Sequence, residues 1–177
     1  EADRLTNLID NLLDASRLQA GGLQLNLAPV QLDQLSQQMA QKFQTQTEKH
    51  KLSVDFSPNF PSIMGDTERL RQVLSNLISN AIKYSQDGGP ITITGTHSQG
   101  EVSVTVTDSG AGLPTTELAR VFDRFHRAST AATERSQGAG LGLYLTRAVI
   151  EAHHGRIWVD SNPGQGASFH FNLPIDT

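Results

Sequence analysis

Apolar residues recur at helical spacing in the stretch 66–85, around which the rest of the chain is organised. This spacing predicts a helix with one buried face, formed by Leu70, Val73, Leu74, Leu77, Ile78 and Ala81. Asp66 comes directly before the helix and is a suitable N-cap, because its carboxylate can accept the first free N–H groups. Asn76 and Asn80 lie one turn apart on the remaining face, and Lys83 continues their row.

The same spacing predicts an amphipathic helix over residues 1–19, which ends at Gly21 and Gly22. Its apolar stripe consists of Leu5, Leu8, Ile9, Leu12 and Leu13. A helix of this length is marginal on its own, so the stripe must pack either on its own domain or on a partner helix in a bundle. Further helices are predicted over residues 32–48, 115–121 and 141–155.

Alternating apolar and polar residues predict short strands between these helices. The predicted strands cover residues 23–27, 51–56, 62–65, 91–97, 101–108, 156–161 and 167–173, with Pro29 closing the first. The pairs 91–97 with 101–108 and 156–161 with 167–173 are predicted hairpins. The order of elements predicts an α/β two-layer sandwich, in which helices cover one face of a mixed sheet and an amphipathic helix precedes it.

Length, charge and cysteine content exclude several classes of protein. The chain has 177 residues, enough for one well-buried domain plus an appendage. Its formal net charge of −4 argues against a nucleic-acid partner, and the absence of cysteine excludes a disulfide framework. No apolar run approaches the ~20 residues of a membrane span. Because the chain starts inside a predicted helix, we expect a cytoplasmic fragment without membrane contact, cut from a parent that can carry an anchor.

Two glycine-rich motifs and the asparagine row carry the candidate chemistry. Asp108-Ser109-Gly110-Ala111-Gly112 follows a predicted strand, where the carboxylate can accept a hydrogen bond from an exocyclic amine; a plain turn is the alternative. The segment 138–143 opens a helix, where backbone N–H groups favour an anion such as phosphate; the alternative is a hinge without a ligand. The asparagines either face water or offer amide oxygens to Mg²⁺, with Lys83 near phosphate.

Three other features carry less chemistry. The polar segment 126–138 has no periodicity and is a candidate lid. Gly164-Gln165-Gly166 fits a hairpin turn without chemistry. His153 and His154, near a helix end, are expected to complement the helix dipole instead of binding a metal.

Taken in order, these motifs resemble the ATP-binding catalytic domain of sensor histidine kinases, within the superfamily of gyrase, mismatch-repair ATPases and ATP-driven chaperones. Residues 76–84 resemble the N box, 108–112 the first glycine box, 122–125 the phenylalanine box, 138–143 the second glycine box and 164–169 the terminal one. The resemblance covers about residues 23–173 and implies a Bergerat-type ATP-binding fold over 23–177. Residues 1–22 resemble the second helix of the dimerisation and phosphotransfer hairpin.

The resemblance implies roles for individual residues. Asn80 would ligate Mg²⁺, helped by Asn76 directly or through water, while Lys83 would meet phosphate. Tyr84 would lie near the adenine of ATP, and Asp108 would accept its N6 amino group and so reject guanine. The pocket would be shaped by Gly110, Gly112, Gly138, Gly140, Leu141 and Gly142, with residues 126–137 as a lid. Arg127 would approach the γ-phosphate.

The resemblance also leaves alternatives open. None of the six histidines lies in a phosphoacceptor context, so the fragment would bind ATP without a histidine of its own to phosphorylate. The implied partners are a response-regulator receiver domain and a second copy of the parent. An ATP-hydrolysing relative would need a carboxylate where Asn76 stands, because an amide is no general base. A nucleotide-sensing module without transfer is the third alternative; a serine-kinase anti-sigma relative would lack the bundle helix.

Overall fold

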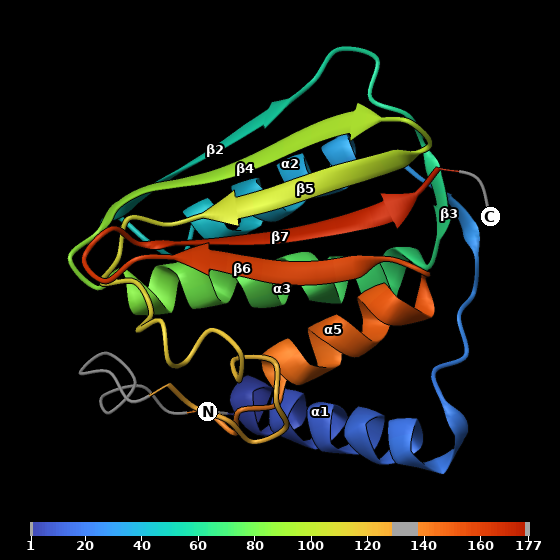
Figure 1. The fold of residues 1–177 in the computed structure, drawn as a ribbon, viewed down its shortest axis with the longest axis horizontal. Coiled ribbons are helices and arrows are strands. Elements are labelled where there is room, and N and C mark those ends of the chain that lie inside the picture. Colours follow the sequence, from blue (N-terminus) through green and yellow to red (C-terminus); the bar gives the residue numbers. More distant parts are fainter. Residues whose placement is uncertain (1, 129–137, 176–177) are drawn as a thin grey trace.

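A twisted five-stranded sheet covered by helices on one face forms the body of the protein (Figure 1). The computed structural model describes residues 2–128 and 138–175. Across the sheet the order is β2 (His50–Phe56), β4 (Gly89–Ser98), β5 (Glu101–Thr107), β7 (Ala167–Pro174) and β6 (Arg156–Ser161). β2 and β4 run parallel, whereas every other neighbouring pair is antiparallel. The predicted mixed sheet and both hairpins are therefore confirmed.

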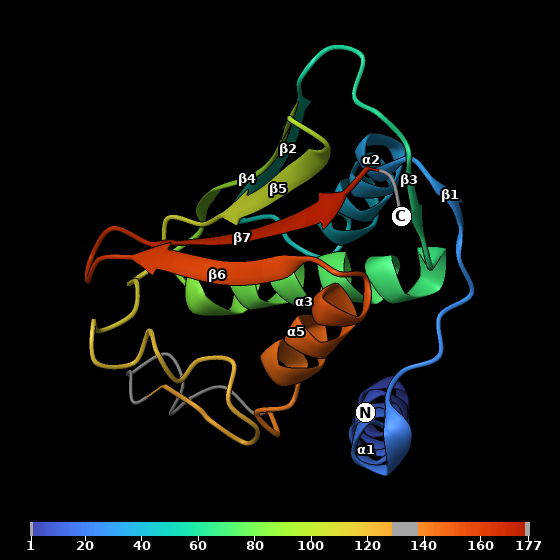
Figure 2. The same ribbon diagram turned by 45° about the vertical axis from the view of Figure 1, so that its right-hand side comes forward.

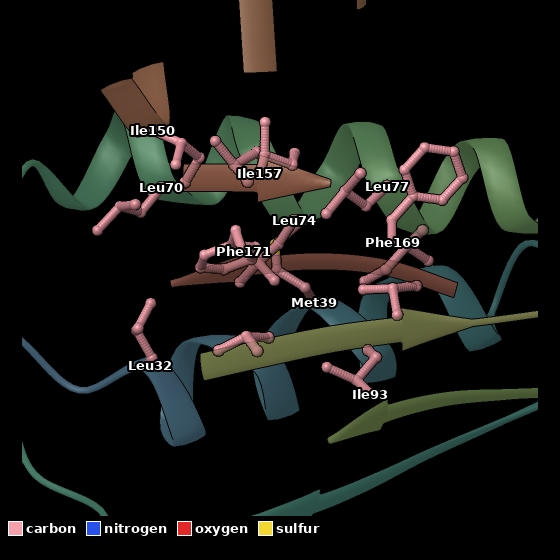
Figure 3. Close-up of a cluster of buried hydrophobic side chains, with 14 of the residues drawn as sticks. Leu32, Met39, Leu70, Leu74, Leu77, Ile93, Ile150, Ile157, Phe169 and Phe171 are labelled. Carbon is pink, nitrogen blue, oxygen red and sulfur yellow. The ribbon is translucent and has the colours of Figure 1, made fainter. Parts of the chain in front are cut away.

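Three helices pack on the inner face of the sheet and enclose the core (Figures 2 and 3). They are α2 (Leu32–Gln44), α3 (Thr67–Tyr84) and α5 (Gly142–Ala152). In the core, Leu74 and Leu77 of α3 meet Met39 of α2 and the alternate residues of β7, among them Phe171. Residues of the sheet thus point inward at every second position, as the strand patterning predicts.

The start of α3 is fixed by one carboxylate. Asp66 caps the helix by accepting from the backbone N–H of Arg69 at 3.1 Å, and its other oxygen accepts from the N–H of Asn26 at 2.9 Å. Its own N–H donates to Nε2 of the buried His153 at 2.9 Å. Burial raises the pKa of Asp66, but these backbone N–H groups outweigh it and hold the pKa below its ordinary value. The end of α5 is thereby tied to the start of α3.

Helix α1 (Ala2–Gly21) lies outside this body, beside α5 (Figures 1 and 2). An ion pair and a small apolar cluster attach its C-terminal half. Arg69 donates to both oxygens of Asp14, at 2.6 and 3.1 Å, and Ala15 is buried in a small cluster with Leu141 and Leu145. Of the two predicted partners for the apolar stripe, the own domain does not cover it, since Leu5 is 61% and Leu13 51% exposed.

The opposite face of the sheet carries polar side chains and the single tryptophan. Trp158 of β6 stacks on the ring of His170 of β7, with 5.2 Å between the ring centroids. The guanidinium of Arg156 lies 4.8 Å from the Trp158 ring centroid, and Asp160 lies 3.0 Å from Nε2 of His170. We find this face uncovered by any helix of residues 2–128 and 138–175.

Two predicted elements are wrong. Residues 23–27 form no strand, because the N–H of Asn26 is used to bond Asp66; β1 (Ala28–Val30) follows and pairs with β3 (Ile63–Gly65), with Pro29 inside the short strand. Residues 115–121 form successive turns, not a helix. Their hydrogen bonds join residues three apart, such as Glu117 N–H to Pro114 and Arg120 N–H to Glu117.

The remaining boundaries differ by a few residues. α2 ends at Gln44 instead of Glu48, and α5 ends at Ala152 instead of Gly155. The turn at 163–166 joins β6 to β7 as predicted. Of the predicted lid, residues 129–137 lie outside the described residues. Among the helices that the structure describes, none is long and apolar enough to cross a membrane.

Candidate functional site

A cavity of about 1100 Å³ lies between α3, the segment 138–143 and the N-terminal half of α1. Its walls include most of the predicted site residues. From α3 come Asn76, Asn80, Lys83 and Tyr84, and from the rest of the chain come Arg127, Gly138, Gly140, Leu141 and Gly142. The end of α3 and the segment 138–142, more than 50 positions apart in the sequence, thus line the same cavity.

The polar residues of α3 line this cavity because the opposite face of the helix is buried in the core. Leu77 and Ile78 are at most 1% exposed, which turns Asn76, Asn80 and Lys83 away from the sheet. Nζ of Lys83 lies 5.3 Å from the ring centroid of Tyr84. The structure therefore brings together the amides, an ammonium group and an aromatic ring along one edge of the cavity.

Asn76 has a structural role that the sequence analysis missed. Its Nδ2 donates to the carbonyl of Gly142 at 2.6 Å and contacts Oγ1 of Thr146 at 3.0 Å, so it joins α3 to the first turn of α5. A Cβ at position 142 would come within 2.7 Å of Oδ1 of Asn76, which explains the glycine. The amide nitrogen is thus committed to α5, and the oxygen is the atom left for a metal or water.

The segment before α5 lies against the backbone of residues 125 and 126. Gly140 adopts φ 69°, and its carbonyl accepts from the N–H of Phe125 at 2.9 Å. Leu141 precedes α5 and provides no side-chain cap, so the segment presents backbone at the N-terminus of the helix, where the dipole favours an anion. Leu141 itself is buried against Ala15 of α1.

Asp108 lies in a second, smaller cavity of about 70 Å³. The two cavities share part of their lining, namely Asn80, Tyr84, Val121, His126, Arg127 and Leu143. Gly112 lines the smaller cavity, whereas Gly110 lines neither and instead donates its N–H to Oδ1 of Asp108 at 2.8 Å. The predicted purine-binding carboxylate and the predicted phosphate-binding segment therefore flank a common wall.

The electrostatics of Asp108 are dominated by burial, since only 7% of the residue is exposed. Burial raises the pKa of its carboxyl group above the ordinary value, and backbone hydrogen bonds with Gly110 and Ala167, followed by the nearby His50, offset part of this rise. A buried acceptor of this kind gains from a ligand that supplies an N–H donor.

Some residues of the walls were not predicted. Asn7 and Asn11 of α1 line the larger cavity at the same four-residue spacing as Asn76 and Asn80, which was a usable signal. His126 lines both cavities beside Arg127, but its neighbour Glu117 could not be inferred from spacing. His153 binds backbone groups of Asp66 and Val149, so its predicted role at the helix end involves specific hydrogen bonds.

Comparison with known proteins bears on this site. The sequence profile described as histidine kinase-, DNA gyrase B- and HSP90-like ATPase matches residues 65–177. The chain belongs to this family. The adaptive-response sensory kinase SasA of Synechocystis sp. is 37% identical to this member over 174 residues, which cover 97% of the chain and 45% of SasA. The sensor histidine kinase WalK of Bacillus subtilis is 34% identical over 180 residues, covering 98% of the chain and 29% of WalK.

Solved structures of histidine kinases share the fold of this family member. Full-length ShkA in complex with AMPPNP matches with a TM-score of 0.87 and 32% identity, covering 99% of the chain and 36% of ShkA. The catalytic domain of the histidine kinase ThkA matches with a TM-score of 0.76 and 26% identity, covering 86% of the chain and all of that domain. The predicted family and fold class are thereby confirmed. The chain spans about half the length of the curated relatives that it matches, or less.

Proposed function

We propose that the chain is the ATP-binding catalytic part of a sensor histidine kinase. In the whole protein it would transfer the γ-phosphoryl group of Mg·ATP to a histidine outside this chain, releasing ADP. The phosphoryl group would then pass to an aspartate of a response-regulator receiver domain. The observation that supports this proposal is the shared wall of the two cavities, which joins Asp108 to the asparagine row and the segment 138–142.

The two cavities suit the two ends of ATP. Asp108 would accept the adenine amino group, with Tyr84 beside the base, because a buried carboxylate selects a donor over the carbonyl oxygen of guanine. Lys83, Arg127 and the backbone of Gly138, Gly140 and Gly142 would hold the phosphates. Phosphoryl transfer depends mainly on positioning and charge neutralisation, and these groups can provide both.

The donors present fit a Mg²⁺ ion that arrives with the nucleotide. The amide oxygens of Asn80 and Asn76 are ligands of the kind that hard cations accept. In the part of the chain that is described, no group of three His, Asp or Glu side chains could hold a metal by itself. Phosphate oxygens would therefore complete the coordination. When bound, the ion neutralises charge on the phosphates.

ATP hydrolysis as the main activity is disfavoured by Asn76. A hydrolase of this superfamily needs a general base at this position, but the amide cannot accept a proton from water. Its nitrogen is moreover occupied by Gly142 and Thr146. A nucleotide-sensing module without transfer remains the alternative that the experiment below distinguishes.

Residues 1–22 are proposed to belong to a dimerisation and phosphotransfer hairpin, and residues 23–177 to the catalytic domain. The exposed stripe of α1 supports this division, since five large apolar side chains on one helix need a partner surface. The parent would be a homodimer whose catalytic part works in the cytoplasm.

The proposal is tested with γ-labelled Mg·ATP on a longer chain that includes the preceding helix. Acid-labile, base-stable label on the protein is the expected result, and Asn80→Ala should abolish it while Asn162→Ala, on an exposed turn, should not. Steady release of free phosphate without labelled protein would show an ATPase instead. Nucleotide binding with neither outcome would leave the sensing module.

A further inference from the structure

The segment 113–128 contributes lining residues to both cavities and forms the wall that they share with α3. Val121 and Phe122 are buried in the core, where Phe122 meets Phe169 edge to face with 6.1 Å between centroids. The residues before and after this anchor form turns instead of a helix. Besides this anchor, backbone hydrogen bonds and one side-chain contact hold His126 beside the cavities.

The side-chain contact joins Glu117 to His126. Oε2 of Glu117 lies 2.6 Å from Nε2 of His126, across nine positions of sequence. The two side chains are only 20% and 10% exposed, so water competes weakly for either group. A short contact between a carboxylate and an imidazole is among the stronger side-chain hydrogen bonds. It closes the turns at 117–126 into a loop fixed at both ends.

The contact also reaches the glycine-rich segment. The backbone of His126 continues from Phe125, whose N–H donates to the carbonyl of Gly140 at 2.9 Å. A Cβ on Gly140 would come within 2.8 Å of the carbonyl oxygen of His126, so the two backbones are in direct contact. Displacement of His126 would thus be felt at the segment proposed to hold phosphate.

We propose that Glu117 is a positioning residue for the nucleotide, acting by holding the imidazole of His126 in the wall between the base and phosphate cavities. This inference rests on the proposed function for the identity of the ligand. Because His126 lines both cavities, loss of the contact weakens ATP and ADP by the same factor. Arg127→Ala, by contrast, weakens ATP more than ADP, since its proposed partner is the γ-phosphate.

The binding test compares two substitutions at Glu117 by calorimetry with Mg·ATP and Mg·ADP. Glu117→Ala lowers the affinity for both by roughly fivefold to tenfold, whereas Glu117→Gln keeps an acceptor and loses less than about threefold. The matched control is Glu151→Ala, which removes a 2.8 Å ion pair with Arg147 on the exposed surface of α5 and leaves both affinities unchanged. Unchanged affinity in Glu117→Ala, or no rescue in Glu117→Gln, would overturn the inference.

A second measurement needs no nucleotide. In amide NMR spectra of the free protein at fixed pH, Glu117→Ala shifts the signals of Phe125 and Gly140, and Glu151→Ala does not. If these signals stay in place, Glu117 does not position the wall. If the unaltered protein fails to bind Mg·ATP, the proposed function is wrong, while this spectrum still decides whether Glu117 holds His126.

Discussion

At Asp108, the proposed binding of adenine and the stability of the free protein make opposite demands on one carboxylate. Its pKa in the folded protein is raised above the ordinary 3.8, with burial as the main cause. A raised carboxyl pKa means that the group favours folding most below pH 3.8 and that this contribution is lost as the pH rises through the raised value. At neutral pH the ionised side chain therefore costs stability, which an adenine amino group would compensate.

Asp108→Asn should separate the two effects. Without ligand, the melting temperature at pH 7 is expected to rise by about 1–3 °C, because the buried charge is removed while Oδ1 can still accept from Gly110. The affinity for ATP should fall by roughly tenfold to a hundredfold, and the preference over GTP should narrow, because an asparagine amide can donate to the guanine carbonyl. Calorimetry with ATP and GTP measures both affinities. An unchanged preference for ATP over GTP would mean that the nucleotide base does not bind at Asp108.

Asn76→Asp is expected to lower stability even without nucleotide. The substitution replaces the donor to Gly142 and Thr146 by a carboxylate that would face the Gly142 carbonyl. We expect a loss of about 1–3 kcal/mol in the free energy of unfolding, measured in urea, and a loss of nucleotide binding. Asn162→Asp, on the exposed turn before β7, is the control and should change neither. A variant as stable as the unaltered protein would show that the joint between α3 and α5 does not depend on this amide.

Among the elements, α1 is held by the ion pair of Asp14 with Arg69 and by the small apolar cluster around Ala15. Arg69 binds Asp14 with both terminal nitrogens, and this hydrogen bond raises the pKa of the guanidinium. Asp14→Asn should therefore release α1 while the body of the protein stays folded. Hydrogen exchange in α1 is expected to become roughly tenfold faster, as measured by mass spectrometry. Asp10→Asn, on the exposed side of the same helix, should leave the exchange of α1 unchanged, and equal exchange in both variants would refute the role of the pair.

The elements that the sequence predicted correctly are those whose partners follow from periodicity. The apolar spacing of α3 and the alternation along β5 and β7 each specify a buried face. The strand expected at 23–27 failed because its alternation competes with a distant group, the Asp66 carboxylate that binds Asn26. The helix expected at 115–121 failed because Phe122 and the Glu117 contact hold both ends of that segment in a tighter path.

The same distinction applies to the candidate site. That Asn80, Lys83, Asp108 and the glycine-rich segment line the cavities could be predicted, because their residue types and spacing are typical of a nucleotide site; their roles toward a ligand stay predictions. The contacts of Asn76 with Gly142 and of Glu117 with His126 could not, since they depend on how separate elements are packed.

At the scale of the whole molecule, the exposed stripe of α1 predicts self-association once the preceding helix is present. Ile9 and Leu13 are 48% and 51% exposed and line neither the larger nor the smaller cavity, so they can be changed without altering the proposed nucleotide site. In the longer chain, Ile9→Glu with Leu13→Glu should weaken the dimer by roughly ten-thousandfold or more, because the two copies together lose four such side chains and burying each contributes about 1.5–3 kcal/mol.

Sedimentation measures this change directly: the unaltered longer chain should be a dimer and the double variant a monomer. The affinity for Mg·ATP is the internal control and should be equal in both. A double variant that stays dimeric would assign the contact between copies to another surface.

The stack of Trp158 and His170 gives the molecule a built-in optical reporter. Trp158 is the only tryptophan, so the intrinsic fluorescence excited at long wavelength comes from one place on the polar face of the sheet. The proposed nucleotide cavities lie on the other side of the sheet, among the helices, and Trp158 lines neither of them. Its emission is therefore expected to change when β6 separates from β7 during unfolding and to stay constant when a ligand binds. Folding and binding can thus be recorded separately in one sample.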